Sequence, residues 1–97
     1  MNELAEQFKH QAKIMGALAH PIRLGVLATL LQGPAIVSDL IEKFQEDQTK
    51  ISKHLAVLRK AGLVDCQADG RCRIYALVDT EAVERILNCM KNISNSS

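Results

Sequence analysis

The spacing of apolar residues in this chain changes from a helical period to a strand period and back, which limits the folds it can adopt. Up to about Ala61 the apolar residues recur at the three- and four-residue spacings typical of helices. Two short stretches, Leu63–Gln67 and Cys72–Val78, then flank Asp69-Gly70, a pair typical of tight hairpin turns. Helical spacing returns from about Thr80. The sequence therefore predicts a mainly α fold with one β-hairpin, in the order α-α-α-α-β-β-α.

The ends of the predicted helices carry residues that favour helix starts and stops. Proline is tolerated in a first helical turn, aspartate caps an N-terminus by accepting hydrogen bonds from free N–H groups, and glycine ends a helix. With 97 residues, the chain has the length of a single domain, residues 1–97. The five predicted helices span Leu4–Leu18, Pro21 to Gly33-Pro34, Ile36–Phe44, Asp47 to Gly62 and Thr80–Ile93. His20 is expected to help begin the second helix, and Asp79 or Thr80 to cap the last one. Residues 92–97 are expected to be a frayed polar tail.

The helix predicted after Asp47 has an outer face suited to DNA. At about 100° per residue, Ile51, Leu55 and Leu58 share one side, and hydroxyl, amide and ammonium groups occupy the other. Such groups suit base edges and phosphates in a major groove, although a merely solvated surface helix would have the same composition. The residues predicted to contact DNA are Gln48, Thr49, Lys50, Ser52, Lys53 and His54, with the reservation that His54 lies beside the inner stripe, where a packing role suits it at least as well.

The predicted hairpin adds two arginines to this surface. Arg71 and Arg73 bracket its tip, where a wing would reach phosphates or a minor groove. Two short helices with a tight connection, followed by such a hairpin, make a winged helix-turn-helix. The net charge is only +1, so a basic surface must come from uneven placement of charge. The acidic residues lie mostly outside these two elements, and those on other predicted helices include Glu3, Glu6, Glu42, Glu81 and Glu84.

Other classes of protein fit the sequence poorly. It contains no Gly-rich phosphate loop, nucleophile elbow or catalytically spaced pair, so we predict no enzyme, no catalytic residue and no cofactor. The polar start Met1–Lys9 does not resemble a signal peptide, and the longest uncharged run, Leu24–Ser38, is too short to span a bilayer. We therefore expect a cytoplasmic protein without membrane contact. A winged helix that binds another protein instead of DNA is the alternative function.

Three stretches of the chain resemble the ArsR/SmtB family of winged helix-turn-helix regulators. Ala17–Leu24 resembles the family's LxHPxR opening, Gln48–Val64 its recognition helix and the exit into the wing, and Asp69-Gly70-Arg71 with Tyr75 the wing itself. The resemblance covers nearly the whole chain, with the motifs in the right order. It implies a homodimer, paired through the first and last helices, that binds a two-fold operator as a repressor and is released by an inducer.

The apolar residues of the terminal helices support a dimer independently of the resemblance. A chain this short buries a limited core, and many such domains gain stability by association. The alternative is that both helices pack only on their own subunit. The residues predicted at the dimer interface are Leu4, Phe8, Met15, Ile86, Leu87 and Met90.

The chain departs from the metal-sensing patterns of the family it resembles. Arsenic and cadmium sensors of the family often carry Cys-Val-Cys-Asp-Leu where this chain has Ile36–Leu40, so both thiolate ligands are missing. Zinc sensors often place Asp and His ligands on the last helix, but no histidine follows His54 in this chain. We therefore predict no metal site. The second predicted helix also lacks the cysteine that persulfide sensors place there. The remaining thiols, Cys66, Cys72 and Cys89, are candidates for sensing a thiol-reactive, soft-metal or redox signal, or are ordinary reduced cysteines. The inducer is thus not identified, and a constitutive repressor is the other possibility.

The register of the predicted hairpin decides whether two of these thiols can meet. A two-residue Asp69-Gly70 loop places Cys66 opposite Arg73 and Gln67 opposite Cys72, with the two cysteines on opposite faces. A three-residue loop, Ala68–Gly70, would place Cys66 directly opposite Cys72, at a separation that suits a disulfide. The Asp-Gly pair favours the first arrangement. We therefore predict free thiols and no structural disulfide.

Overall fold

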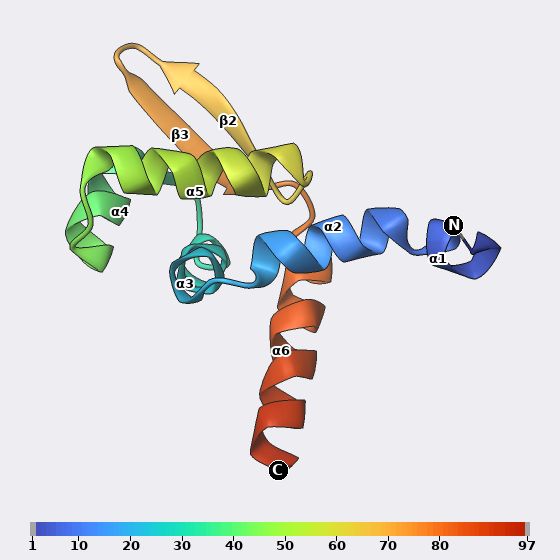
Figure 1. Ribbon diagram of the computed structural model, residues 1–97. Coiled ribbons are helices and arrows are strands. Elements are labelled where there is room, and N and C mark those ends of the chain that lie inside the picture. Colours follow the sequence, from blue (N-terminus) through green and yellow to red (C-terminus); the bar gives the residue numbers. More distant parts are fainter. Residues whose placement is uncertain (1, 97) are drawn as a thin grey trace.

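The computed structural model of the chain describes residues 2–96. Its central helices carry a hairpin on one side, while the first helices and the last helix extend away from them in different directions (Figure 1). This arrangement confirms the predicted fold class, a mainly α winged helix-turn-helix. The elements are α1 (Glu3–Gln7), α2 (Lys9–Leu18), α3 (Pro21–Leu30), β1 (Ala35–Ile36), α4 (Val37–Phe44), α5 (Gln48–Lys60), β2 (Val64–Asp69), β3 (Cys72–Leu77) and α6 (Thr80–Ser96).

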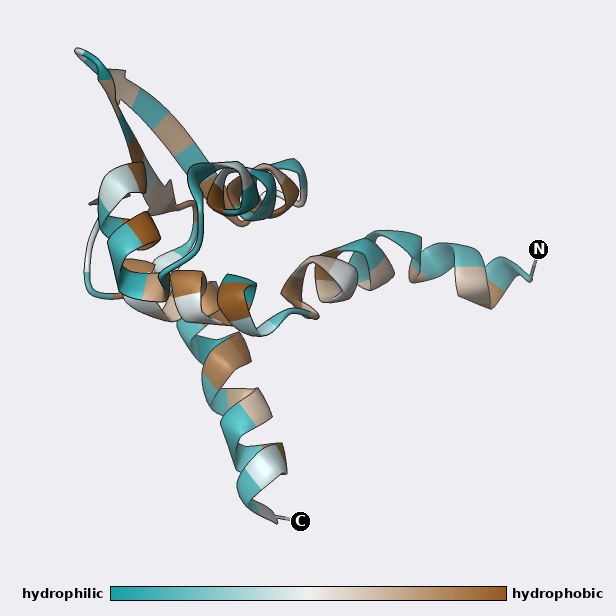
Figure 2. Cartoon of the chain, turned by 60° about the vertical axis from the view of Figure 1, so that its left-hand side comes forward, coloured by the Kyte–Doolittle hydropathy of each residue, from teal (hydrophilic) through white to brown (hydrophobic). Residues whose placement is uncertain are grey.

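The core lies where α3, α4 and α5 meet the base of the hairpin. The predicted inner stripe of α5, Ile51, Leu55 and Leu58, is fully buried there, together with Leu27 and Leu40. Each such side chain contributes roughly 1.5–3 kcal/mol when it leaves water. Figure 2 shows the hydrophobic segments of these helices turned toward one another. The core therefore fixes which side of α5 faces outward.

Side chains accept hydrogen bonds at the starts of four helices, and the first of these is α1, where Asn2 Oδ1 accepts from Leu4 N at 2.7 Å. His20 Nδ1 accepts from Ile22 N at 3.1 Å at the start of α3. Asp47 Oδ1 accepts from Lys50 N at 2.8 Å, and Asp79 Oδ1 accepts from Ala82 N at 3.0 Å. Each bond satisfies a backbone donor that has no partner within its helix. The predicted roles of His20 and Asp47 are confirmed, and of the two predicted caps for α6, Asp79 makes the bond.

Three helical predictions differ from the structure. Residues 92–97 were expected to be frayed, yet α6 continues to Ser96, and Ser97 lies outside the described residues. Asn and Ser lower helix propensity by less than about 1 kcal/mol per residue, so they do not stop a helix that is already formed. The first helix is interrupted at Phe8, which separates α1 from α2. Finally, the helix predicted to begin at Ile36 begins at Val37, because Ala35–Ile36 forms a short strand that was not predicted from the sequence.

The hairpin closes one residue later than predicted. Cys66 pairs with Tyr75 and Asp69 with Cys72, so the loop is Gly70-Arg71, and both registers considered from the sequence are wrong. Gly70 has a φ of 62°, and a glycine readily adopts the positive φ that such a two-residue loop requires at its first position. Pairing by this register still places Cys66 and Cys72 on opposite faces, because side chains alternate along a strand.

The hairpin belongs to a three-stranded antiparallel sheet with the order β1-β3-β2. Ala35 pairs with Tyr75 and Ile36 with Ile74, so β1 joins β3 near its middle. This sheet connects the start of α4 directly to the wing. In residues 2–96, no helix combines the length and the apolar character needed to cross a bilayer.

Candidate nucleic-acid interface

Helices α4 and α5 form a helix-turn-helix with a short connection. Gln45, the C-terminal cap of α4, has φ 52° and ψ 42°, the left-handed conformation that turns the chain sharply. This conformation costs a non-glycine residue roughly 1–2 kcal/mol. Asp47 then begins α5. The turn and the buried stripe of α5 together present its polar side to solvent, beside the wing (Figure 1).

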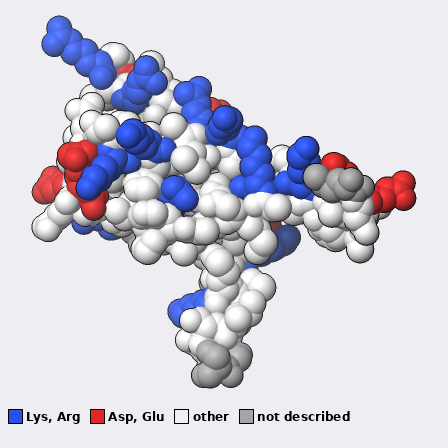
Figure 3. All heavy atoms as spheres, in the orientation of Figure 1, with Lys and Arg blue, Asp and Glu red and all other residues white. Residues whose placement is uncertain are grey.

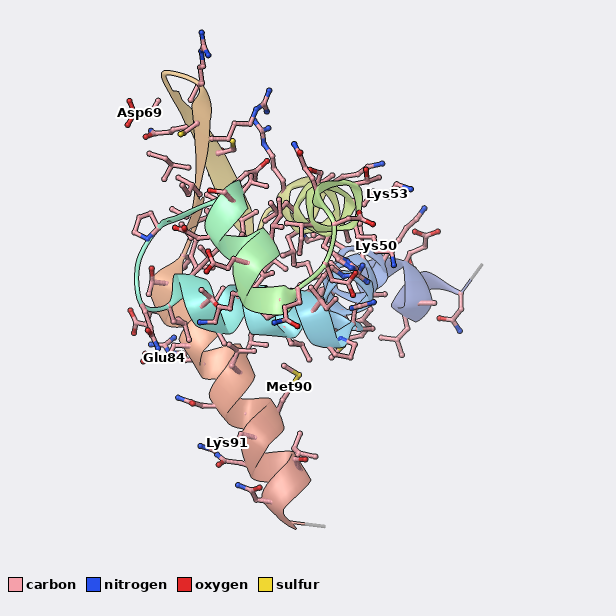
Figure 4. The ribbon with its side chains drawn as sticks, turned by 90° about the vertical axis from the view of Figure 1, so that its left-hand side faces the viewer. Lys50, Lys53, Asp69, Glu84, Met90 and Lys91 are labelled. Carbon is pink, nitrogen blue, oxygen red and sulfur yellow. The ribbon has the colours of Figure 1, made fainter. Side chains whose placement is uncertain are left out.

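The outer face of α5 carries its predicted residues in exposed positions. Gln48, Thr49, Ser52 and Lys53 are all exposed. Lys50 is exposed as well, but its ammonium lies 3.6 Å from the carboxylate of Glu46. A surface ion pair contributes about 0.2–1 kcal/mol, so Lys50 can exchange Glu46 for a phosphate at little cost. Lys50 and Lys53 both extend from α5 into solvent in Figure 4.

Basic side chains gather over α5 and the wing. In Figure 3, Lys and Arg lie along the upper edge of the molecule, and the acidic side chains of that view lie mainly near α4 and at the N-terminal end. The net charge of the whole chain is only +1. The uneven placement of charge expected from the sequence is therefore present on this face.

A groove of about 750 Å³ lies between α5 and the wing. Its lining brings together four residues predicted to bind DNA, two from α5 and two from the wing, and no carboxylate belongs to it. Thr49, Lys50 and Lys53 lie outside the groove on the exposed surface of α5. The lining residues are Ile36, Val37, Ser38, Gln48, Ser52, Ala56, Arg59, Lys60, Arg71, Cys72, Arg73 and Tyr75.

Two of these basic residues, Arg59 and Lys60, were not among the predicted DNA contacts. Arg59 follows Ser52 by seven residues on α5, which is about two helical turns, so both line the same groove. This seven-residue spacing in the sequence could have identified Arg59 as a residue on the same face of the helix as Ser52. The outer face predicted for this helix did include Lys60, with Arg59 on its flank, but the predicted DNA contacts were limited to its first turns, whereas the groove extends to its C-terminal end.

Tyr75 forms the buried part of the groove's lining. It lies on the same face of β3 as Arg73, opposite Cys66 of β2. Burial, and next the adjoining Cys66 thiol, raise the pKa of Tyr75 above its usual value. A phenol is protonated at neutral pH with or without this shift, so Tyr75 can donate a hydrogen bond to an anion in the groove.

The three cysteines are not brought together. Cys66 is half-buried on the core-facing side of the wing, Cys72 is exposed near its tip, and Cys89 is exposed on α6. All three are free thiols. No group of three His, Cys, Asp or Glu side chains among residues 2–96 is arranged to hold a metal ion. Of the three thiols, Cys72 alone borders the groove.

His54 faces inward from α5 and does not line the groove. Its Nδ1 lies 3.3 Å from Arg23 Nη1, and its ring centroid lies 4.3 Å from that of His20. Burial is the main cause that lowers the pKa of His54, followed by the proximity of His20 and Arg23. The packing role left open from the sequence describes this position better than a DNA contact.

The residues predicted at a dimer interface fall into two groups. Leu4, Phe8 and Met15 are 61%, 55% and 67% exposed, which is unusual for three large apolar side chains on adjoining helices. Ile86 and Leu87 pack partly against the core of their own subunit. Met90 is half-buried on α6, where it points away from the direction of Lys91 (Figure 4).

Comparisons with known proteins agree with this geometry. Residues 20–65 match the model of a family described as bacterial regulatory protein, arsR family. The chain is 41% identical over 73 residues to the HTH-type transcriptional regulator NmtR of Mycobacterium tuberculosis, which covers 75% of this chain and 61% of that protein. The chain thus spans less than two thirds of that relative. It is also 34% identical over 82 residues to an HTH-type transcriptional regulator of Methanocaldococcus jannaschii, covering 84% of this chain and 92% of the relative.

A solved structure extends the similarity to the whole fold. The homodimeric winged helix-turn-helix DNA-binding domain of a possible ArsR-family regulator from Mycobacterium bovis superposes with a TM-score of 0.83. It is 25% identical, and the match covers 98% of this chain and 87% of that one. These relatives are transcriptional regulators rather than enzymes, as the sequence predicts. The matched residues include α3, α4, α5 and the start of the wing, and the chain belongs to the ArsR family of bacterial regulatory proteins.

Proposed function

We propose that the chain is a sequence-specific DNA-binding transcriptional regulator that acts in the cytoplasm as a homodimeric repressor. The observation that carries this proposal is the groove between α5 and the wing. Arg59, Lys60, Arg71 and Arg73 line it, and no carboxylate does. A cleft of one charge sign, open to solvent, attracts a polyanion and holds it through phosphate contacts.

The two sides of the groove have different tasks in this proposal. Helix α5 is the recognition helix, and Gln48, Thr49 and Ser52 near its N-terminal end contact base edges in the major groove. A good bidentate base contact contributes about 1–3 kcal/mol of discrimination. Arg71 and Arg73 of the wing contact phosphates, which holds the protein in register on the duplex without reading sequence.

A homodimer accounts for the exposed apolar residues of the first helices. Leu4, Phe8 and Met15 do not line the groove, and more than half of each residue's surface is exposed in its own subunit. The similar domain from Mycobacterium bovis is described as homodimeric. A two-fold pair of recognition helices would bind two half-sites about one helical turn apart. The operator is therefore expected to be two-fold symmetric.

Selection of genomic DNA fragments by the purified protein tests this function. The selected duplex and a scrambled duplex of the same length are then compared by fluorescence anisotropy at several salt concentrations. We expect the selected duplex to bind at least about a thousandfold more tightly, which is typical of specific binding. Equal affinity for both duplexes would contradict sequence-specific recognition, and no binding even at low salt would favour the protein-binding alternative.

A further inference from the structure

The side chain of Arg23 joins three helices beneath the DNA-binding face. Arg23 lies on α3, and its Nε donates to the carbonyl oxygen of Ala17 at 2.7 Å. Its Nη2 donates to the carbonyl oxygen of Gly16 at 3.4 Å, so two of its bonds hold the C-terminal end of α2. The third nitrogen, Nη1, lies 3.3 Å from Nδ1 of His54 on α5. One guanidinium therefore connects α2 to the recognition helix.

This contact specifies the protonation of His54. A guanidinium has only donors, so Nδ1 of His54 must be the acceptor, and the ring must be neutral with its proton on Nε2. The neighbouring His20 also uses Nδ1 as an acceptor, in its case from Ile22 N. The two rings lie 4.3 Å apart. Nδ1 of His54 is thus the acceptor that lies beside the permanent positive charge of Arg23.

Most of the groups around His54 disfavour its protonation. His20 precedes α3, Arg23 lies on α3, and both oppose a charge on His54, as does burial. Glu46, just before α5, favours a positive charge on His54, but its carboxylate also lies 3.6 Å from the ammonium of Lys50. A protonated His54 would lose its bond to Arg23 and repel the guanidinium instead.

The positions of the joined residues give this contact a functional meaning. Gly16 follows Met15, one of the exposed apolar residues of the proposed dimer surface, and His54 follows Ser52 and Lys53 of the recognition helix. We propose that Arg23 is a positioning residue that sets the recognition helix relative to α2 through neutral His54, so that DNA affinity falls when His54 becomes protonated. This inference rests on the proposed DNA-binding function.

Four proteins test the inference: the parent, Arg23→Gln, His54→Gln and the control His10→Gln. His10 is an exposed histidine on α2 that belongs to no part of the cluster. Glutamine at position 54 offers the guanidinium an amide oxygen and does not titrate. Affinity for the selected duplex is measured at constant ionic strength between about pH 8 and pH 5.5, the range in which histidines titrate. Nitrogen-15 NMR of labelled histidine reports the tautomer and the titration of His54 in parent and Arg23→Gln.

The expected result separates positioning from charge alone. Parent and His54→Gln should bind equally near pH 8, and the parent should weaken by about tenfold relative to His54→Gln as His54 becomes protonated, a difference of about 1.4 kcal/mol. A simple gain of positive charge near DNA would strengthen binding instead. His10→Gln should follow the parent. The NMR spectra should show His54 as the Nε2–H tautomer, with its titration midpoint moved upward in Arg23→Gln.

Several outcomes would overturn the proposal. A constant ratio of parent to His54→Gln affinity across the pH interval in which the NMR spectra show His54 gaining its proton would exclude a positioning role, as would a proton on Nδ1 of neutral His54. An Arg23→Gln protein that melts at a lower temperature but keeps the parent's DNA affinity near pH 8 would show that the residue is merely structural. A parent that binds no DNA near pH 8 would instead overturn the proposed function, and this inference with it.

Discussion

The ring of Phe44 on α4 packs directly against the backbone of Gly25 on α3. A Cβ on Gly25 would lie 3.0 Å from Phe44 Cζ and 2.6 Å from Phe44 Cε1, and the second distance is shorter than real Cβ atoms show. Gly25 is therefore the position where the helix that begins the DNA-binding motif rests on α3. The side chain of Phe44 would have to move to admit even a methyl group there.

We expect Gly25→Ala to destabilise the fold by about 1–3 kcal/mol, the usual effect of overpacking. Gly16→Ala is the matched control, because an added Cβ on Gly16 meets nothing within 4 Å. In a helix that change should stabilise by roughly 0.5–1 kcal/mol. Urea denaturation followed by circular dichroism measures both free energies of unfolding. Equal effects of the two substitutions would show that Phe44 moves aside freely.

The wing arginines should contribute affinity without sequence preference. Arg71→Ala and Arg73→Ala should weaken binding to the selected and the scrambled duplex alike, and each phosphate that is no longer neutralised should reduce the slope of log affinity against log salt by about one. Arg85→Ala is the control, because Arg85 pairs with Glu81 on α6 and its replacement removes the same charge away from the groove. Unchanged salt slopes for both wing variants would show that the wing does not touch DNA.

Thr49→Ala and Ser52→Ala should instead change which sequences bind, because their hydroxyls lie at the N-terminal part of α5, where base edges are read. Ser52 lines the groove and Thr49 is exposed beside it. The expected loss is about 1–3 kcal/mol on the selected duplex for a good base contact and little on the scrambled one. Repeating the fragment selection with each variant measures this. Equal losses on both duplexes would assign these hydroxyls to phosphates.

A charge among the exposed apolar residues of the first helices should separate the dimer. Phe8→Glu and Met15→Glu each place a carboxylate where the proposed interface is apolar, and sedimentation at micromolar concentration should change from twice the chain mass to one chain mass. Lys13→Glu introduces the same charge at an exposed polar position of α2 and should remain dimeric. A monomeric variant that still binds a two-fold operator as tightly as the parent would contradict the proposed assembly.

The two wing thiols should not form a disulfide with each other while the protein is folded. The observed register places Cys66 and Cys72 on opposite faces of the hairpin, whereas a disulfide needs their Cβ atoms to point toward each other. Mild oxidation followed by peptide mass spectrometry should find this bond only when denaturant is present. Its rapid formation in the native protein would require a different register of the wing.

The helices could be predicted from the sequence because their determinants are local. The cap at Asp47, the proline at the start of α3 and the three-residue stripe of α5 each act within one or two helical turns. The predicted position of the hairpin loop was wrong because Gly70 suits either the second or the first position of a two-residue loop. The register also depends on which residues of the hairpin face the core. Val64 and Tyr75 are buried on one face of the hairpin, and the residues of the loop do not show which face will be buried.

The missing parts of the predicted site have a similar cause. The strand Ala35–Ile36 has only two residues and exists because it pairs with β3, more than thirty positions later in the chain. The groove depends on the distance between α5 and the wing, so Arg59 and Lys60 joined the site only when both elements were in place. The contact between Arg23 and His54 likewise joins residues 31 positions apart.

The short strand β1 supports the base of the wing and leaves its tip with fewer neighbours. Ile36 pairs with Ile74, so β3 has a strand on each side at this point, whereas the ribbon beyond it has only β2 as a neighbour. From Ile74 to Arg71 the ribbon extends by about 10 Å, at about 3.3 Å per residue, and this length carries both arginines. The tip can therefore adjust to the phosphate backbone of the duplex, while α5 stays fixed in the core. The protein would then combine a rigid recognition helix with a wing tip that adapts to the backbone it contacts.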